Sequence, residues 1–169
     1  MDVLFHGMEE ELFWQVIERI EHGAKAEEKV SASVQFLSYL SEDNIVAFYE
    51  SLSEKLFHLD QEKYANPILE GREHFSADTF LYARAFVVSQ GSAFYQKVLD
   101  DPALMPIEET FEPLLYIPEK AYFLKTGKNL LHVPQYCDET YSNRSGWPAD
   151  TPSILEIIRR DNADAQLIR

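Results

Sequence analysis

Residues 41–59 read SEDNIVAFYESLSEKLFHL, and this stretch decides the fold class of the protein. Its apolar residues recur every three or four positions, which is the spacing of one face of an α-helix. Ser41 stands where a serine side chain serves as a helix N-cap. The stretch therefore predicts an amphipathic helix. Its inward face is expected to carry Ile45, Phe48, Tyr49, Leu52, Leu56 and Leu59.

The helical spacing continues on both sides of this stretch. The further predicted helices are 8–22, 25–40, 64–69, 77–89, 93–99 and 108–126. Ser76 and Ser92 are the expected N-caps before 77–89 and 93–99. Glycines are expected to end the helices, Gly23 the first and Gly127 the last before the arm. Pro118 predicts a kink or two successive helices within the last one, because proline lacks the backbone donor of a helix interior.

The helical pattern disappears between residues 128 and 150, where proline and aromatic residues are frequent. We expect an irregular arm here, and Thr151-Pro152 then predicts the cap and first turn of a terminal helix. The fold prediction is therefore all-α and mainly helical, a single-domain multi-helix bundle. Residues 1–127 form its helical domain, and residues 128–169 form the arm and terminal helix that pack on it.

Three aromatic residues of the arm are the candidate partner-binding residues: Tyr136, Tyr141 and Trp147. An aromatic side chain in an aperiodic segment can anchor either the arm to its own domain or a partner to the arm. The sequence leaves both alternatives open.

The charge balance narrows the classes of partner. The chain has 169 residues with 29 acidic and 15 basic side chains, a formal net charge of -14. Such a field repels nucleic acid and anionic lipid, so we expect neither as a partner. It favours encounter with a basic protein, although excess acid could also serve only solubility. The single Cys137, the absence of a signal-like start and the absence of a long apolar run predict a cytoplasmic protein.

Arg84 is the most informative single position. Its helix places Phe80, Leu81, Val87 and Val88 around it, so the guanidinium leaves from the middle of an apolar arc. A buried guanidinium is costly without a partner, so we expect either an internal carboxylate or a cleft where an anion binds. The candidate residues around such an ion pair or anion site are Arg84, Asp78, Arg72 and His74.

Catalytic and metal-binding motifs are not apparent. Glu70 and His74 have helical chelate spacing, but Gly71 between them argues against a metal site. Residues 125–128 read KTGK, which lacks the earlier glycine and the following hydroxyl of a phosphate loop. Cys137 near His132 is expected to be a free, packed thiol. We therefore predict no catalytic residue, no metal and no cofactor.

Several segments in order resemble an uncharacterised bacterial family of small helical domains, some of whose members are fused to a WGR domain. The matching pieces are Phe13-Trp14 with Ile17, Leu40-Ser41, Ile45 to Phe48, Asp78 to Gly91 with Phe80, Arg84 and Val87, Leu114 to Tyr116, Ala121-Tyr122 and Thr126-Gly127. The resemblance covers about Glu9 to Lys128. Phe86-Val87 replaces the Trp-Leu of the family, and Pro118 interrupts its usual last helix. The resemblance implies a helical fold and no assigned activity.

Two hypotheses of function follow. The first is a non-catalytic cytosolic interaction protein that binds a basic protein partner, for example as an acidic immunity or antitoxin protein that blocks a basic toxin. The second is a small-molecule or anion-binding domain, which could be enzymatic, with a cleft around Arg84.

Overall fold

The computed structural model describes residues 7–23, 25, 28–69, 76–106, 108–153, 156–157 and 159. These residues form α-helices and short 3-10 helices and no strand, so the all-α prediction is confirmed. The α-helices are α1 (Glu10–Ile17), α2 (Ser31–Tyr39), α3 (Glu42–His58), α4 (Glu62–Leu69), α5 (Ala77–Ser89), α6 (Ser92–Asp100) and α7 (Ile117–Thr126). The 3-10 helices are η1 (Pro102–Leu104), η2 (Glu112–Tyr116) and η3 (Arg144–Gly146).

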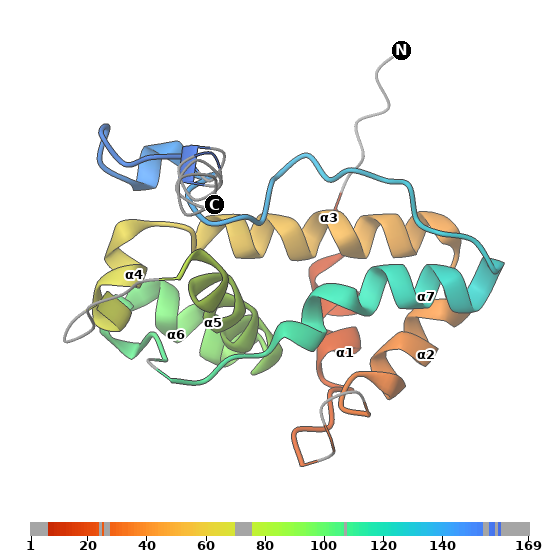
Figure 1. Ribbon diagram of the computed structural model, residues 1–169. Coiled ribbons are helices and arrows are strands. Elements are labelled where there is room, and N and C mark those ends of the chain that lie inside the picture. Colours follow the sequence, from red (N-terminus) through yellow and green to blue (C-terminus); the bar gives the residue numbers. More distant parts are fainter. Residues whose placement is uncertain are drawn as a thin grey trace, which may run out of the picture.

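The longest helix, α3, organises the bundle. It contacts α2 and α7 toward one end and α5 toward the other (Figure 1). After α7 the chain turns back and runs along α3 as an extended segment, shown in cyan to blue (Figure 1). Within the described part of the chain, no helix combines the length and apolarity needed to cross a membrane.

The core is built from the predicted apolar face of α3 and its partners. Ile45, Phe48, Leu52 and Leu56 are all buried, as expected. Tyr49, which was predicted to face inward, is only half-buried, whereas the next residue, Glu50, is buried. The helical period alone does not predict a buried carboxylate, because its partners come from the distant arm.

Capping residues mark the predicted starts of α3 and α5. The hydroxyl of Ser41 accepts a hydrogen bond from the backbone N–H of Asn44 at 3.1 Å, and that of Ser76 from Thr79 at 3.4 Å. Gly127 ends α7 with a left-handed φ of 69°, a conformation that glycine adopts without steric cost. These predictions are confirmed. They could be made from the sequence because a cap depends only on neighbouring residues.

α1 and α2 are both shorter than the helices predicted at 8–22 and 25–40, so these lengths are wrong. The first helix ends early and the second begins late. The hydroxyl of Ser33, near the start of α2, donates to the carbonyl of Val16, near the end of α1, at 2.8 Å. The chain therefore turns between the two helices, which pack against each other. This tertiary packing outweighs the local helix propensity of the turn residues.

Two other helix starts differ from the prediction. Gly91, with φ 91°, occupies the N-cap position of α6, and Ser92 is the first helical residue. Near the C-terminus, Ser153 replaces Thr151 as the capping residue. The N–H of Ser153 donates to Glu156 Oε2 at 2.7 Å, and the N–H of Glu156 donates to Ser153 Oγ at 3.3 Å. This reciprocal pair is a capping box. Ile154, Leu155 and Ile158 of the predicted terminal helix lie outside the described residues.

Pro118 separates two successive elements, as predicted. The 3-10 helix η2 precedes α7, and Pro118 occupies the first turn of α7, where its missing N–H costs nothing. The helical segment begins at Glu112, later than the predicted Glu108.

Lys55 ties α3 to α1. Its Nζ lies 2.9 Å from each carboxylate oxygen of Glu10 and 5.0 Å from the ring centroids of both Phe13 and Trp14. The indole N–H of Trp14 also donates to Glu10 at 2.7 Å. Burial raises the pKa of Glu10, but the hydrogen bonds from Lys55 and Trp14 lower it by more than burial raises it. The pKa therefore lies below its ordinary value of 4.5.

This contact predicts a pH-dependent contribution to stability. A carboxyl whose folded-state pKa is lowered stabilises the fold above its unfolded pKa, near 4.5, and loses that effect as the pH falls through the folded-state value. We expect Glu10→Gln to lower the free energy of unfolding at neutral pH by less than about 1 kcal/mol, because Glu10 is largely exposed. The difference should shrink in urea titrations at acid pH. Glu9→Gln is the control, since it leaves the Lys55 contact intact.

Candidate functional site

Arg84 of α5 is fully enclosed where the arm crosses the helical body. Its Nη1 donates to the backbone carbonyl of Leu56 in α3 at 2.8 Å, and its Nη2 donates to the Thr140 hydroxyl of the arm at 3.0 Å. Thr140, itself fully buried, donates to the carbonyl of Ala77 at 2.7 Å. The guanidinium carbon lies 4.9 Å from the ring centroid of Phe80. The arm thus forms one wall of the enclosure.

The direct partners of Arg84 differ from the expected ones. The sequence predicts a contacting carboxylate or an open cleft, whereas both hydrogen-bond acceptors are neutral oxygens. Among the described residues, no carboxylate lies within ion-pair distance of the guanidinium, and its buried Nε has no hydrogen-bond partner. Burial lowers the pKa of Arg84. Negative charges nearby oppose this shift, and that of Asp60 has the largest effect among them.

Asp60 follows α3 directly and is the main attachment point of the arm. Its side chain is fully buried and accepts three N–H groups from the arm. Oδ1 accepts from the backbone of Tyr141 and from the indole of Trp147, each at 3.0 Å, and Oδ2 accepts from the backbone of Asn143 at 2.9 Å. Hydrogen bonds to an ionised carboxylate are among the stronger ones in proteins. The side-chain amide of Asn143 also donates to the carbonyl of Phe57 at 3.1 Å.

The backbone around Asp60 is closely fitted to the arm. Tyr141 has a φ of 72°, which is unfavourable for a residue with a side chain, and its N–H is the one that Asp60 accepts. Gly146 packs so tightly against Gln61 that a Cβ there would overlap the glutamine side chain. The arm therefore docks in one defined conformation at this end of α3.

Glu50 forms a second attachment point farther along α3. Its Oε1 lies 2.5 Å from Nε2 of His132, and its Oε2 accepts the backbone N–H of Gln135 at 3.0 Å. This explains why a glutamate of α3 is buried. Two carboxylates thus hold the arm in place, that of Glu50 within α3 and that of Asp60 just after α3.

The three aromatic residues predicted to bind a partner contact the protein itself. The ring of Tyr136 lies 5.0 Å from that of Phe57, Tyr141 lies 4.7 Å from Trp147, and Trp147 lies 5.9 Å from Phe80. All three side chains are half-buried. They anchor the arm, and their contact with a partner stays a prediction.

The other residues predicted near Arg84 do not join it in the structure. Asp78 is exposed in the first turn of α5, and no ion pair links it to Arg84. Arg72 and His74 lie outside the described residues. Within those residues, no group of three or more histidine, cysteine or acidic side chains is arranged to hold a metal ion.

A surface feature that the sequence analysis missed lies on α2 and α7. Tyr39, Phe123 and Leu124 are 77%, 58% and 59% exposed, and we call them the α2–α7 apolar face. Tyr39 and Leu124 line one hollow of about 390 Å³ together, and Phe123 and Leu124 line another of about 440 Å³. Leu124 lies one turn after the buried Ala121, near the end of α7, and the other described residues leave more than half of it exposed.

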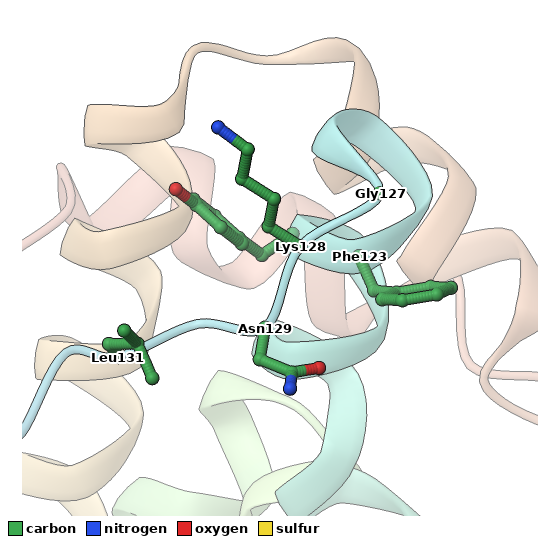
Figure 2. Close-up of a pocket in the computed structure, with 6 residues that line it drawn as sticks. Phe123, Gly127, Lys128, Asn129 and Leu131 are labelled. Carbon is green, nitrogen blue, oxygen red and sulfur yellow. The ribbon is translucent and has the colours of Figure 1, made fainter.

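A third hollow, of about 550 Å³, connects this face to the start of the arm. Phe123 and Leu131 project on either side of Asn129 (Figure 2). Lys128 extends from the same turn of the chain (Figure 2). The apolar surface therefore continues from the end of α7 onto the arm.

Comparison with known protein families identifies the family of this chain. The family model described as "Protein of unknown function (DUF4240)" matches residues 8–123. The chain belongs to the DUF4240 family. The predicted resemblance to an uncharacterised helical family is thereby confirmed. No curated protein and no solved structure matches the chain. The DUF4240 match includes Arg84, Asp60 and Glu50 but not the arm residues that contact them, such as Thr140 and Asn143.

Proposed function

We propose that this DUF4240 protein is a non-catalytic protein-interaction domain that binds another protein through the α2–α7 apolar face. The observation that carries the proposal is the exposure of Tyr39, Phe123 and Leu124 side by side along shared hollows. Large apolar side chains gathered on a surface are typical of protein contact sites, and aromatic ones supply much of the binding energy.

Charge supports a basic protein as the partner. The rim of the apolar face is mixed, with Glu119, Lys120 and Lys125. The long-range field is set by the whole chain, whose formal net charge is -14. Such a field accelerates encounter with a basic protein, and the apolar face then supplies the short-range contact. An acidic immunity protein that blocks a basic toxin is one concrete form. Cys137 is exposed, so the prediction that it is packed is wrong. A chain with this single cysteine suits a reducing compartment, and we place the interaction in the cytoplasm.

The alternative of anion binding at Arg84 receives less support from the geometry. Both terminal nitrogens of the guanidinium are already engaged, by Leu56 and by Thr140. An anion at Nη2 of Arg84 would have to displace Thr140, which is itself bonded to Ala77. We therefore retain the interaction proposal alone.

A capture experiment tests the proposal. The immobilised full chain is exposed to an extract of the native host, beside the double variant Phe123→Ser, Leu124→Ser and the control Leu104→Ser. Leu104 is 46% exposed and does not belong to the apolar face. We expect the wild type and the control to retain the same basic protein, the double variant to lose it, and added salt to slow its association. Equal capture by the double variant, or no specific capture by the wild type, would contradict the proposal.

Point variants are required here because deletion of the arm would not be a clean test. Removing residues after Lys128 would also remove Thr140 from Arg84 and all three donors from Asp60. Asp60 would then lose its arm donors and Arg84 one of its two acceptors, so loss of binding could reflect unfolding.

A further inference from the structure

The two hollows that Leu124 lines lie in a groove between α2 and α7. These helices contact each other and lie side by side at one end of the bundle (Figure 1). Residues of both helices line each hollow. The hollow of about 440 Å³ is lined, besides Asn129, by Val34, Glu119, Lys120, Phe123 and Leu124. The hollow of about 390 Å³ is lined by Gln35, Ser38, Tyr39, Leu124 and Lys125. We call these two hollows together the α2–α7 groove.

The two hollows follow each other along the groove with the spacing of a helical turn. From the first to the second, the lining residues advance from 34 to 35–39 on α2 and from 119–124 to 124–125 on α7. The mean advance is roughly three residues on each helix, or about 5 Å along its axis. Side chains at positions i and i+3 or i+4 of a helix also lie about 5–6 Å apart. A third helix laid along the groove would therefore place one apolar side chain in each hollow.

Lysines surround this groove in an otherwise acidic protein. Each hollow of the apolar surface, including the third one of about 550 Å³, has one lysine in its lining: Lys120, Lys125 and Lys128. Among the described residues that line these hollows, Glu119 is the single acidic one. Glu42 lies near the third hollow and already accepts the hydroxyl of Tyr122 at 3.0 Å. The local charge balance is thus the reverse of the 29 acidic and 15 basic side chains of the whole chain.

We propose that the partner docks an amphipathic helix in the α2–α7 groove, with apolar side chains in the two hollows and carboxylates beside the lysines. This inference rests on the proposed function, because it names the segment that the α2–α7 apolar face binds. Long-range and short-range charge then have different effects. The net charge of -14 speeds encounter with a basic protein, whereas the lysines select acidic residues on the helix that makes the contact.

Synthetic peptides test the charge of the docking helix. Three helical peptides of equal length share one leucine stripe at positions i, i+4 and i+7. The positions beside the stripe are all glutamate, all glutamine or all lysine. In fluorescence anisotropy with the purified full chain, the glutamate peptide should have a dissociation constant at least about tenfold below that of the lysine peptide. The net charge of the chain favours the lysine peptide, so equal or tighter binding of that peptide would overturn the inference.

Charge reversal on the protein tests whether the groove causes this preference. The double variant Lys120→Glu, Lys125→Glu should raise the dissociation constant of the glutamate peptide at least about tenfold and lower that of the lysine peptide. The matched control is Lys63→Glu, Lys97→Glu, which makes the same change in net charge at exposed positions of α4 and α6. It should leave the order of the peptides unchanged. Equal effects of the two double variants would assign the preference to net charge and contradict the inference.

A proline in the middle of the glutamate peptide tests the helical form of the segment. It breaks the helix but keeps the apolar and acidic residues on either side, so binding should weaken at least about tenfold. Undiminished binding would overturn the helical inference in favour of an extended segment.

The variant Phe123→Ser, Leu124→Ser separates this inference from the proposed function. It should abolish binding of the glutamate peptide as well as capture of the host partner, because both use the α2–α7 apolar face. If the variant loses the host partner while the wild type binds no peptide, or binds all three alike, the proposed function stands and the inference fails. If the wild type captures no host protein, the proposed function itself fails.

Discussion

Asp60→Ala is expected to lower the free energy of unfolding by about 3–5 kcal/mol, the usual cost of removing one partner from a buried charged network. The substitution leaves the N–H groups of Tyr141 and Asn143 and the indole of Trp147 without their acceptor. Each hydrogen bond to a charged group contributes on the order of 1.5–3 kcal/mol, and the three are not additive. The variant also removes the negative charge that most opposes the lowered pKa of Arg84.

Urea unfolding and amide hydrogen exchange together measure this effect. Protection of the Tyr141 and Asn143 amides should fall more than that of the α3 core, because the arm detaches before the body unfolds. Asp60→Asn keeps an acceptor oxygen without the charge and should be intermediate. Asp78→Ala is the matched control, since Asp78 is exposed in the first turn of α5 and should contribute about 0.3–1 kcal/mol through the helix dipole. If Asp60→Ala and Asp78→Ala behaved alike, Asp60 would not be the attachment point.

Arg84→Ala is also expected to lower the free energy of unfolding by about 3–5 kcal/mol. It removes the largest fully buried side chain of the described residues and leaves a cavity beside Phe80. It also takes the donor from the Leu56 carbonyl and from the Thr140 hydroxyl. Arg84→Met restores most of the volume without the charge, so it should recover a large part of the loss. The remaining deficit should be about 1–2 kcal/mol, the cost of the unsatisfied acceptors.

A double-mutant cycle separates the arm contact from the packing of Arg84. Arg84→Met and Thr140→Val are measured singly and together by urea unfolding, and a coupling free energy of about 1.5–3 kcal/mol is expected for a hydrogen bond to a charged donor. No coupling would show that the arm and Arg84 stabilise the fold independently. If Arg84→Met were as unstable as Arg84→Ala, the charge rather than the volume of the side chain would be the dominant contribution.

The family assignment gives these variants a wider use. Arg84 and Asp60 lie within the DUF4240 match, whereas the residues of the arm that engage them lie beyond it. The two variants therefore test how far the matched helical body depends on a segment outside the family range.

The candidate site around Arg84 could be predicted from the sequence only in part. The position of Arg84 in the middle of an apolar arc correctly indicated a buried guanidinium, because the helical period places a residue on a face without knowledge of its partners. The nature of its acceptors could not be predicted. Thr140 is 56 positions away in the chain, and no pattern in its neighbourhood marks it as a partner of α5. Asp60 reads simply as a polar residue after a helix.

The burial of large apolar side chains was also hard to predict from the sequence. Tyr136, Tyr141 and Trp147 were conspicuous in an aperiodic segment, yet Tyr136 and Trp147 pack against the body and Tyr141 packs against Trp147. Phe123 and Leu124 stand in a predicted helix, and no prediction was made of their exposure; both are exposed near the end of α7. Whether an apolar side chain is covered depends on what lies opposite it, which composition does not reveal.

Local sequence patterns are sufficient to predict the helical class, the starts of α3 and α5 at Ser41 and Ser76, the end of α7 at Gly127 and the irregular character of the arm. These features depend on residues within about one helical turn of each other, so local spacing and capping chemistry suffice. The closure of the arm over Arg84 depends instead on contacts between distant parts of the chain. Asp60 and Tyr141 are 81 positions apart, and such contacts form only when packing of the whole bundle brings distant backbone and side-chain groups together.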